Sequence, residues 1–354
     1  MQHFQDVIDA TRGTATPFLA VDEAAMARNI ARLQTECDEA GVALRPHIKT
    51  HKSSAIARMQ LDAGAIGVTC ATMSEAIALG EAGCAADVYV STPIHFDVPK
   101  RRLLERVAAL HPTVTLTIDG DDVARSFVRS APPDVGAMIE VDCGLHRTGT
   151  SPDRAAALVD VIGDRFRGFA THGGHSYRPG GAEAAGRDER DALARAQAAL
   201  GSPAGVLSAG STPSAPHASG EPVTELRPGT YVFGDNQQAV LGSCRSDDLA
   251  AVIVATVIHV SDGRCVIDAG AKALSKDRAD WLQSYGRVVG HEDAVIDRLN
   301  DNHGMVEGSG ALGVGDRVAV VPNHICPVVN LFDEVLLVGD GVRSIEVDLR
   351  GRLV

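Results

Sequence analysis

The stretch LRPHIKTHKS, residues 44–53, decides how the rest of this chain is interpreted. Apolar and basic residues alternate along its first half, which is the period-two pattern of a strand with one buried face. The same ten residues hold one arginine, two lysines and two histidines, which are costly to bury. A solvated loop would account for such a run as well as a site would. Because the run alternates and helical patterns flank it, we predict a strand that ends in a pocket.

A lysine at the end of such a strand would have unusual chemistry. Partial desolvation and neighbouring cations lower the pKa of an ammonium group. The free amine is then a nucleophile for a carbonyl carbon, which is the chemistry of a Schiff base. Both Lys49 and Lys52 meet this description, and their spacing does not decide between them.

Length, composition and charge place the chain in a broad class. Its 354 residues can form two domains, or one large barrel with an appendage. A hydrophobic content of 45% is typical of a soluble globular protein. The formal net charge of -13 argues against binding nucleic acid or an anionic membrane through bulk electrostatics.

The cysteines and the N-terminal segment indicate the compartment. The seven cysteines form no C-x-x-C pair, so we expect reduced thiols. No apolar run approaches the roughly 20 residues that span a bilayer. The opening MQHFQDVIDATRG does not have the pattern of a secretory signal. These features predict a cytoplasmic protein.

Residues 16–235 alternate short apolar runs with helical patterns. Repeated strand–helix units indicate parallel strands, and eight of them in this length fit a closed (β/α)8 TIM-type barrel better than an open sheet. The eight predicted strands are FLAVD (18–22), the lysine stretch (44–53), IGVTCAT (66–72), DVYVST (87–92), VTLTID (114–119), GAMIEVD (136–142), FRGFATHGG (166–174) and GVLSAGST (205–212). Residues 236–354 are instead rich in β-branched runs broken by Gly and Asp, which predicts a C-terminal all-β domain that includes residues 1–15.

Two turns that follow strands are rich in glycine and hydroxyl side chains. AGSTPS (209–214) and RPGTYVFGD (227–235) could cradle a phosphate with backbone N–H groups and hydroxyls. Each signal alone is weak, because such turns are usually only turns. Together with a strand-end lysine they suggest a phosphate-bearing aldehyde, pyridoxal 5'-phosphate (PLP).

At this point the sequence resembles a known family. It is similar to the alanine-racemase-type (fold type III) PLP enzymes, within the group of D-threonine aldolases and D-serine dehydratases. The motifs that carry the resemblance include RPHIKTHKS, GAIGVTCATMSEA, EVDCGLHRTG, GHSY, SAGSTPS, ELRPGTYVFGD, DAGAKALSKD and PNHICPVVNLFDE. They extend over nearly the whole chain.

The resemblance assigns roles to individual residues. Lys49 would attach the cofactor and act as the base for the α-proton, with Lys52 in support. Arg147 would hydrogen-bond the phenolate oxygen of the cofactor, and His172 and Tyr177 would lie against the pyridine ring. The residues implied for holding the cofactor and its phosphate are Tyr177, Ser211, Thr212, Gly229, Thr230 and Tyr231.

The motif PNHICP bears on the reaction. If the segment is extended, His324 and Cys326 at i and i+2 point to the same side. Imidazole and thiolate are good zinc ligands, but alone the pair is more often a buried histidine beside a structural cysteine. In the family this position supplies the two protein ligands of a divalent cation, for which we expect Zn²⁺, with Mn²⁺ or Mg²⁺ as alternatives. Asp268 in IDAGAKALSKD, together with Lys272 and Asp277, is expected to shape a loop over the site.

The resemblance implies a lyase acting on D-3-hydroxy amino acids. Cys326 favours a dehydratase of D-serine, D-threonine or D-threo-3-hydroxyaspartate, because the aldolases more often carry aspartate at that position. The alternative is a D-threonine-type aldolase that gives glycine and an aldehyde. A racemase of the same fold and a non-catalytic PLP-binding protein are further alternatives. The expected partner is a small D-amino acid, and the expected assembly is a homodimer.

Overall fold

The computed structural model describes residues 2–308 and 310–354. The chain forms two compact units, each assembled from segments that are far apart in sequence. The barrel unit contains Arg32–Lys49, Ile56–Gly229 and Gly351–Val354, and the β unit contains Met1–Ala31, Thr50–Ala55 and Thr230–Arg350. Among the described residues, no helix combines the length and apolar character that a membrane span requires.

The barrel unit is built on a sheet of eight parallel strands in the order β2-β9-β8-β7-β6-β5-β4-β3. The strands are β2 (Ala43–Leu44), β3 (Val68–Cys70), β4 (Asp87–Val90), β5 (Thr113–Ile118), β6 (Gly136–Glu140), β7 (Phe166–Ala170), β8 (Val206–Ala209) and β9 (Glu225–Leu226). An isolated bridge between His47, just after β2, and Thr69 of β3 joins the two edges of this sheet. The predicted barrel is therefore confirmed.

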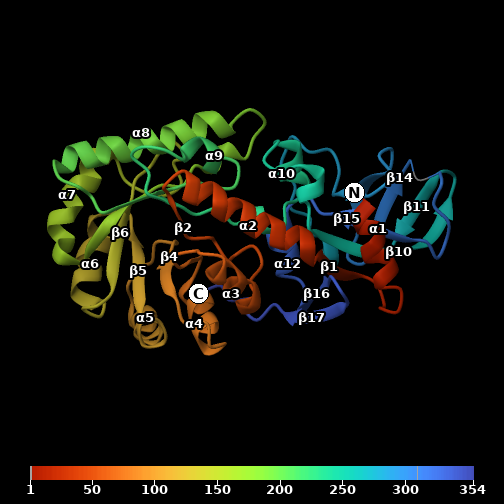
Figure 1. Cartoon of the computed structure of the whole chain (residues 1–354), viewed down its shortest axis with the longest axis horizontal. Coiled ribbons are helices and arrows are strands. Elements are labelled where there is room, and N and C mark those ends of the chain that lie inside the picture. The colour runs from red at the N-terminus through yellow and green to blue at the C-terminus, as the bar shows by residue number, and fades with distance from the viewer. Residues whose placement is uncertain (1, 309) are drawn as a thin grey trace. The chain divides into compact units, whose positions relative to one another are not determined.

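Helices cover the outside of these strands, as Figure 1 shows for α4 to α8. The helices are α2 (Glu23–Glu39), which begins in the β unit, α3 (Ser54–Asp62), α4 (Met73–Glu81), α5 (Val98–Leu110), α6 (Asp121–Ser130), α7 (Pro152–Ile162), α8 (Ala182–Leu200) and α9 (Ala215–Ala218), with 3-10 turns η1 (Gly163–Arg165) and η2 (Gly174–Ser176). Inside the ring, Tyr89, Met138 and Ala170 from three different strands pack together. The interior is therefore a packed core, and the polar side chains gather where the strands end.

One of the eight predicted barrel strands is wrong. FLAVD forms β1 (Phe18–Asp22), but this strand pairs with β10 and β16 in the β unit. The missing barrel strand is β9, which has only two residues and lies inside the motif ELRPGTYVFGD. An apolar run shows that a strand exists, but it does not show which sheet the strand joins.

The β unit is a nine-stranded sheet in the order β11-β14-β13-β12-β15-β10-β1-β16-β17, with a further pairing of β11 to β10. Its other strands are β10 (Ala251–Ser261), β11 (Arg264–Ile267), β12 (Arg287–Val288), β13 (Val295–Leu299), β14 (Gly304–Glu307), β15 (Arg317–Val321), β16 (Glu334–Val338) and β17 (Val342–Glu346). Because β10 pairs with both β11 and β15, six antiparallel strands close into a small barrel. This confirms the predicted C-terminal β domain.

Short helices complete the β unit. They are α1 (Gln2–Ala10), α10 (Asn236–Val240), α11 (Ala271–Leu274) and α12 (Ile325–Val329), with 3-10 turns η3 (Thr230–Val232) and η4 (Ser246–Asp248). Phe4, Val7 and Ile8 of α1 pack into a core that also contains Phe18 of β1 and Val254 of β10. The burial of this apolar helix face attaches the N-terminal segment to the sheet.

The expected one-sided burial of residues 44–53 is wrong. Only Ala43–Leu44 are in a regular strand, and Arg45 and His47 are buried together with their apolar neighbours. A strand of a parallel barrel is covered on both faces, so even basic side chains in it must find buried partners. Arg45 does so by pairing with Glu225 at 2.7 Å and with Asp87 at 2.8 Å.

The Arg45–Glu225 ion pair gives a prediction for stability. Glu225→Ala leaves the buried guanidinium with one partially exposed partner, so we expect the barrel unit to lose about 3–5 kcal/mol of unfolding free energy. Glu81→Ala, which breaks the exposed pair with Arg106, is the matched control and should cost less than about 1 kcal/mol. Chemical denaturation followed by circular dichroism measures both. Similar small losses in the two variants would show that the buried pair does not stabilise the barrel.

Candidate active site

Lys49 lies in a turn directly after the bridge residue His47 and is half-buried. Its positive charge is one of the causes that lower the pKa of His47, and the same holds for His172 at the end of β7. The ammonium group therefore lies close to two imidazoles. Lys52, in contrast, is buried in the β unit, where its backbone has a positive φ of 48°.

The two imidazoles near Lys49 are neutral. Burial, followed by the charges of Lys49 and Arg227, lowers the pKa of His47 well below its ordinary value. Burial, followed by Lys49 and Arg147, lowers the pKa of His172 to about 3. A neutral imidazole can accept a hydrogen bond or lie against an aromatic ring without adding a charge. The predicted place of His172 beside a pyridine ring is compatible with this state.

Arg147 and Tyr177 come from the loops that follow β6 and β7. Arg147 is exposed, and its charge acts on both Glu140 and His172, so it lies on the same side of the barrel as Lys49. Tyr177 is half-buried at the end of the turn η2. The structure therefore brings Lys49, Arg147 and His172 together as predicted.

A group of hydroxyls forms a small cradle after β8. The Ser211 hydroxyl lies 2.8 Å from that of Ser176 and 2.9 Å from that of Ser214. The buried hydroxyl of Thr212 has no hydrogen-bond partner among the described residues. A buried unpaired hydroxyl is costly unless a ligand satisfies it. Gly210 just before has a positive φ of 85° that a side chain would strain. The cradle therefore fits a phosphate.

Glu189 of α8 fixes the shape of this cradle and is fully buried. One carboxylate oxygen accepts the N–H groups of Gly173 and Gly210, each at 2.9 Å, and the other accepts the Ser214 hydroxyl at 2.7 Å. These donors lie in the loops after β7 and β8. A single carboxylate thus ties both strand-end loops to the same helix.

The remaining predicted phosphate residues are divided between the two units. Gly229 ends a segment of the barrel unit, whereas Thr230 and Tyr231 begin η3 in the β unit. All three are buried. The Thr230 hydroxyl lies 3.8 Å from Sγ of Cys326, which is a metal candidate rather than a phosphate residue. The phosphate role of these residues stays a prediction.

His324 and Cys326 meet, although not in the way predicted. The segment is not extended: His324 is the N-terminal cap of α12, and Cys326 lies in the first turn of this helix. The two side chains nevertheless lie together, because Cys326 raises the pKa of His324 through its charge and through a side-chain hydrogen bond. Imidazole and thiolate are a donor set that suits zinc.

Carboxylates surround this pair. Burial alone would lower the pKa of His324, but Cys326, Asp277 and Asp235 raise it to about 11. Asp235 is fully buried and accepts the N–H of Ile325, the residue between the two candidate ligands, at 3.1 Å. Asp235 also caps α10 by accepting the N–H of Gln238 at 2.8 Å. In the described chain, no group of three or more His, Cys, Asp or Glu residues is arranged to hold a metal ion.

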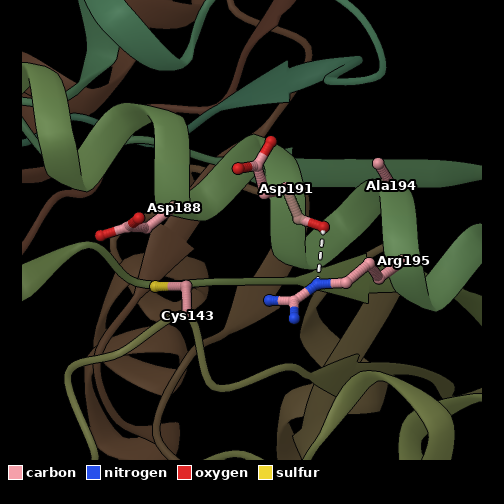
Figure 2. A pocket seen from close by; sticks show the side chains of 5 residues that line it. All are labelled: Cys143, Asp188, Asp191, Ala194 and Arg195. Atoms are coloured by element: carbon pink, nitrogen blue, oxygen red, sulfur yellow. Dashed lines mark hydrogen bonds between the residues drawn. The ribbon is translucent and has the colours of Figure 1, made fainter.

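A cavity of about 420 Å³ lies elsewhere in the barrel unit. Figure 2 shows its lining, with Asp188, Asp191, Ala194 and Arg195 on α8 and Cys143 on the loop after β6. Asp188 pairs with His175 at 3.0 Å, and burial raises the pKa of the Cys143 thiol to about 12. This thiol is therefore protonated and unreactive. None of these residues is a predicted site residue, and we assign the cavity no part in the chemistry.

Comparison with known proteins identifies the family. Residues 21–237 match the family "Alanine racemase, N-terminal domain", and residues 250–338 match "Putative serine dehydratase domain". D-threo-3-hydroxyaspartate dehydratase from Delftia sp. (strain HT23) is 33% identical, over 88% of this chain and 90% of the relative. The chain belongs to the alanine-racemase-type PLP enzymes, in the group of D-threonine aldolases and D-serine dehydratases. Enzymes of this group are PLP-dependent lyases, and this chain is one of them.

Other members and solved structures agree with this placement. D-threonine aldolase from Arthrobacter sp. is 30% identical, over 92% of this chain and 90% of the relative. The structure of the Delftia dehydratase has a TM-score of 0.84 at 31% identity and covers 94% of this chain and 97% of that chain. Alanine racemase from Corynebacterium glutamicum has a TM-score of 0.65 at 18% identity, which shows a shared fold alone.

Two variant structures of a D-threo-3-hydroxyaspartate dehydratase are also similar. One carries a His→Ala substitution and the other a Cys→Ala substitution two positions further along that chain. The Cys→Ala variant is in a metal-free form. In the chain described here, His324 and Cys326 have the same order and the same spacing as the substituted His and Cys of those variants.

Sequence reasoning missed two residues of the barrel site. Arg227 is buried, donates to the Ser208 hydroxyl and to the Thr171 carbonyl, and lies over the Tyr89 ring at 5.4 Å. In the sequence, Glu189 could not be distinguished from the other charged residues of α8. A signal existed for Arg227, because it opens the motif RPGTYVFGD, but none existed for Glu189, whose partners are 16 to 25 residues away.

The anchoring role of Glu189 gives a prediction for cofactor binding. Glu189→Ala leaves two loop N–H groups and the hydroxyls of Thr171 and Ser214 without this acceptor, so we expect PLP to bind at least about tenfold more weakly. Glu189→Gln keeps one carbonyl acceptor and should lose less. Glu183→Ala, at an exposed position of the same helix, is the control. Titration of the apoprotein with PLP, followed by absorbance, measures all three, and equal affinities in Glu189→Ala and Glu183→Ala would contradict the anchoring role.

Proposed function

We propose that this chain is a PLP- and divalent-metal-dependent dehydratase of D-3-hydroxy amino acids. Its products would be a 2-oxo acid and ammonia, and D-serine, D-threonine and D-threo-3-hydroxyaspartate are the candidate substrates. The observation that carries the proposal is the His324–Cys326 pair, which has the spacing of the His and Cys substituted in the dehydratase variants. The first of the relatives described above is also a dehydratase.

The barrel residues support the cofactor part of the proposal. Lys49 would hold PLP and remove the α-proton. Its side chain is half-buried, and the two imidazoles beside it are neutral, so they add no positive charge next to the amine. Ser211 and Thr212 would bind the phosphate, and the unpaired Thr212 hydroxyl would gain a partner. Arg147 would donate to the phenolate oxygen. Bound PLP would supply an electron sink for the negative charge left at the α-carbon.

The β unit supports the metal part of the proposal. His324 and Cys326 would hold the cation, and two protein ligands leave positions open for water or substrate, as a catalytic site requires. Thiolate favours a soft ion, so we propose Zn²⁺ ahead of Mn²⁺ or Mg²⁺. A divalent cation there would act as a Lewis acid toward the β-oxygen of the substrate, whose departure as hydroxide is otherwise difficult.

An aldolase reaction is the second candidate. The D-threonine aldolase relative is nearly as similar as the dehydratase, and cleavage of the Cα–Cβ bond would use the same lysine and the same cation. A racemase is less favoured, because the racemase structure shares the fold alone and a racemase needs no metal pair. A non-catalytic PLP-binding protein is disfavoured by the match of residues 250–338 to a dehydratase domain.

Incubation with D-threonine separates the two main candidates. A dehydratase gives 2-oxobutanoate and ammonia, whereas an aldolase gives glycine and acetaldehyde, and chromatography with mass spectrometry distinguishes these products. We expect 2-oxobutanoate. We also expect the activity to be lost in His324→Ala, in Cys326→Ala and after chelation of the wild type. Added zinc should restore the activity of the chelated wild type but not that of the two variants. Full activity without metal would contradict the proposal, and glycine as the main product would replace it with the aldolase.

The oligomeric state has its own test. The resemblance implies a homodimer, and this stays a prediction. Size-exclusion chromatography with light scattering would give twice the chain mass of 37.0 kDa for a dimer. A monomeric and active enzyme would show that one chain contains everything the reaction needs.

A further inference from the structure

Asp277 contacts one of the two ring nitrogens of His324. Its Oδ2 lies 2.5 Å from Nδ1 of His324, and an ionised carboxylate can only accept a hydrogen bond. Nδ1 is therefore the donor in this contact and carries a proton. When the ring gives up its second proton to bind a metal, this contact keeps the remaining proton on Nδ1 and leaves the lone pair of Nε2 for the metal.

Thr50 makes the corresponding contact to the second ligand. Its hydroxyl lies 3.2 Å from Sγ of Cys326, and Thr50 is fully buried. When the sulfur is a thiolate it has no proton to give, so the hydroxyl must donate. Thr50 directly follows Lys49 in the sequence, within the stretch LRPHIKTHKS.

We propose that Asp277 and Thr50 are positioning residues for the metal ligands, Asp277 for the imidazole of His324 and Thr50 for the sulfur of Cys326. This inference rests on the proposed metal function of that pair. It assigns a purpose to Asp277 beyond the shaping of a loop, and it gives Thr50 a role separate from that of the adjacent lysine. Both residues act through a ligand and neither is itself a ligand.

The exposure of Asp277 argues that the contact does not serve to stabilise the fold. The Asp277 side chain is 54% exposed and that of His324 is 34% exposed. An ion pair as open to solvent as this one contributes little to the stability of a fold. A carboxylate behind a ligand histidine, in contrast, typically strengthens metal binding 10- to 100-fold. Loss of Asp277 should therefore weaken metal binding while leaving the fold intact.

Cobalt(II) binding to the PLP-loaded, metal-stripped protein tests the inference. Thiolate-bound cobalt absorbs through a sulfur-to-metal charge-transfer band, so the spectrum reports the pair directly. We expect Asp277→Ala to weaken cobalt binding about 10- to 100-fold, with Asp277→Asn in between, because an amide oxygen can still accept from Nδ1. Asp280→Asn removes an exposed charge three residues away and should bind as the wild type does.

Thr50 is tested by the position of the band rather than by affinity alone. A hydrogen bond stabilises the sulfur lone pairs, so Thr50→Val should move the charge-transfer band to lower energy, and Thr50→Ser should restore it. A change of packing with the hydrogen bond intact would not produce this shift. The PLP absorbance of each variant shows whether the adjacent Lys49 is disturbed.

The outcomes separate the inference from the function on which it rests. If the wild type shows no charge-transfer band, or if His324→Ala and Cys326→Ala retain it, the metal proposal is wrong and the inference fails with it. If the wild type shows the band and both single-ligand variants lose it, the pair binds metal. In that case, equal cobalt affinity in Asp277→Ala and Asp280→Asn, or an unshifted band in Thr50→Val, overturns the inference alone.

Discussion

The constraint on which this structure depends is the burial of a run of basic residues between positions 45 and 52. Of the five basic side chains in this run, four are buried, and each has to be paired or neutral. Arg45 is paired with Glu225 and Asp87, whereas His47 is held neutral by burial and by nearby positive charges. The backbone of the same run completes the barrel, because Arg45 and His47 donate to the carbonyls of Leu226 and Pro228.

This constraint also distinguishes Lys49 from its neighbours. Lys49 is half-buried, the least enclosed of the five side chains, and it lies where the run leaves the barrel. Its charge helps to lower the pKa of His47 and of His172, so both imidazoles stay neutral. A half-buried amine in such surroundings is accessible to a carbonyl compound. Lys52, which is buried in the β unit, does not have these surroundings.

The sequence was sufficient for the architecture but not for the partners of each strand. The alternation of strands and helices predicts a barrel, and β-branched runs predict the second domain, because both patterns are local. The assignment of FLAVD to the barrel is wrong, since its partners β10 and β16 lie more than 200 residues away. The strand β9 escaped detection because two residues carry no periodicity.

The candidate site also divides into residues that sequence motifs indicate and residues that only the structure identifies. Lys49, Arg147, His172, Ser211 and Thr212 follow strands, so their position in strand-end motifs indicates that they gather at one end of the barrel. His324 and Cys326 were assigned through the resemblance of the motif PNHICP to the family, although the assumed extended backbone is wrong, because α12 begins at Ile325. The contacts of Glu189 and Asp277 could not be predicted, since an acidic residue on a helix or in a loop looks like an ordinary solvated charge until its partner is known.

The central claim is that Lys49 carries the cofactor, and borohydride reduction of the PLP-loaded enzyme tests it most directly. Reduction converts the Schiff base into a stable pyridoxyl-lysine, and peptide mass spectrometry locates the modified residue. The account predicts one modified lysine, Lys49, in the peptide that spans LRPHIKTHKS. Modification of Lys52, or of a lysine outside this stretch, would contradict it.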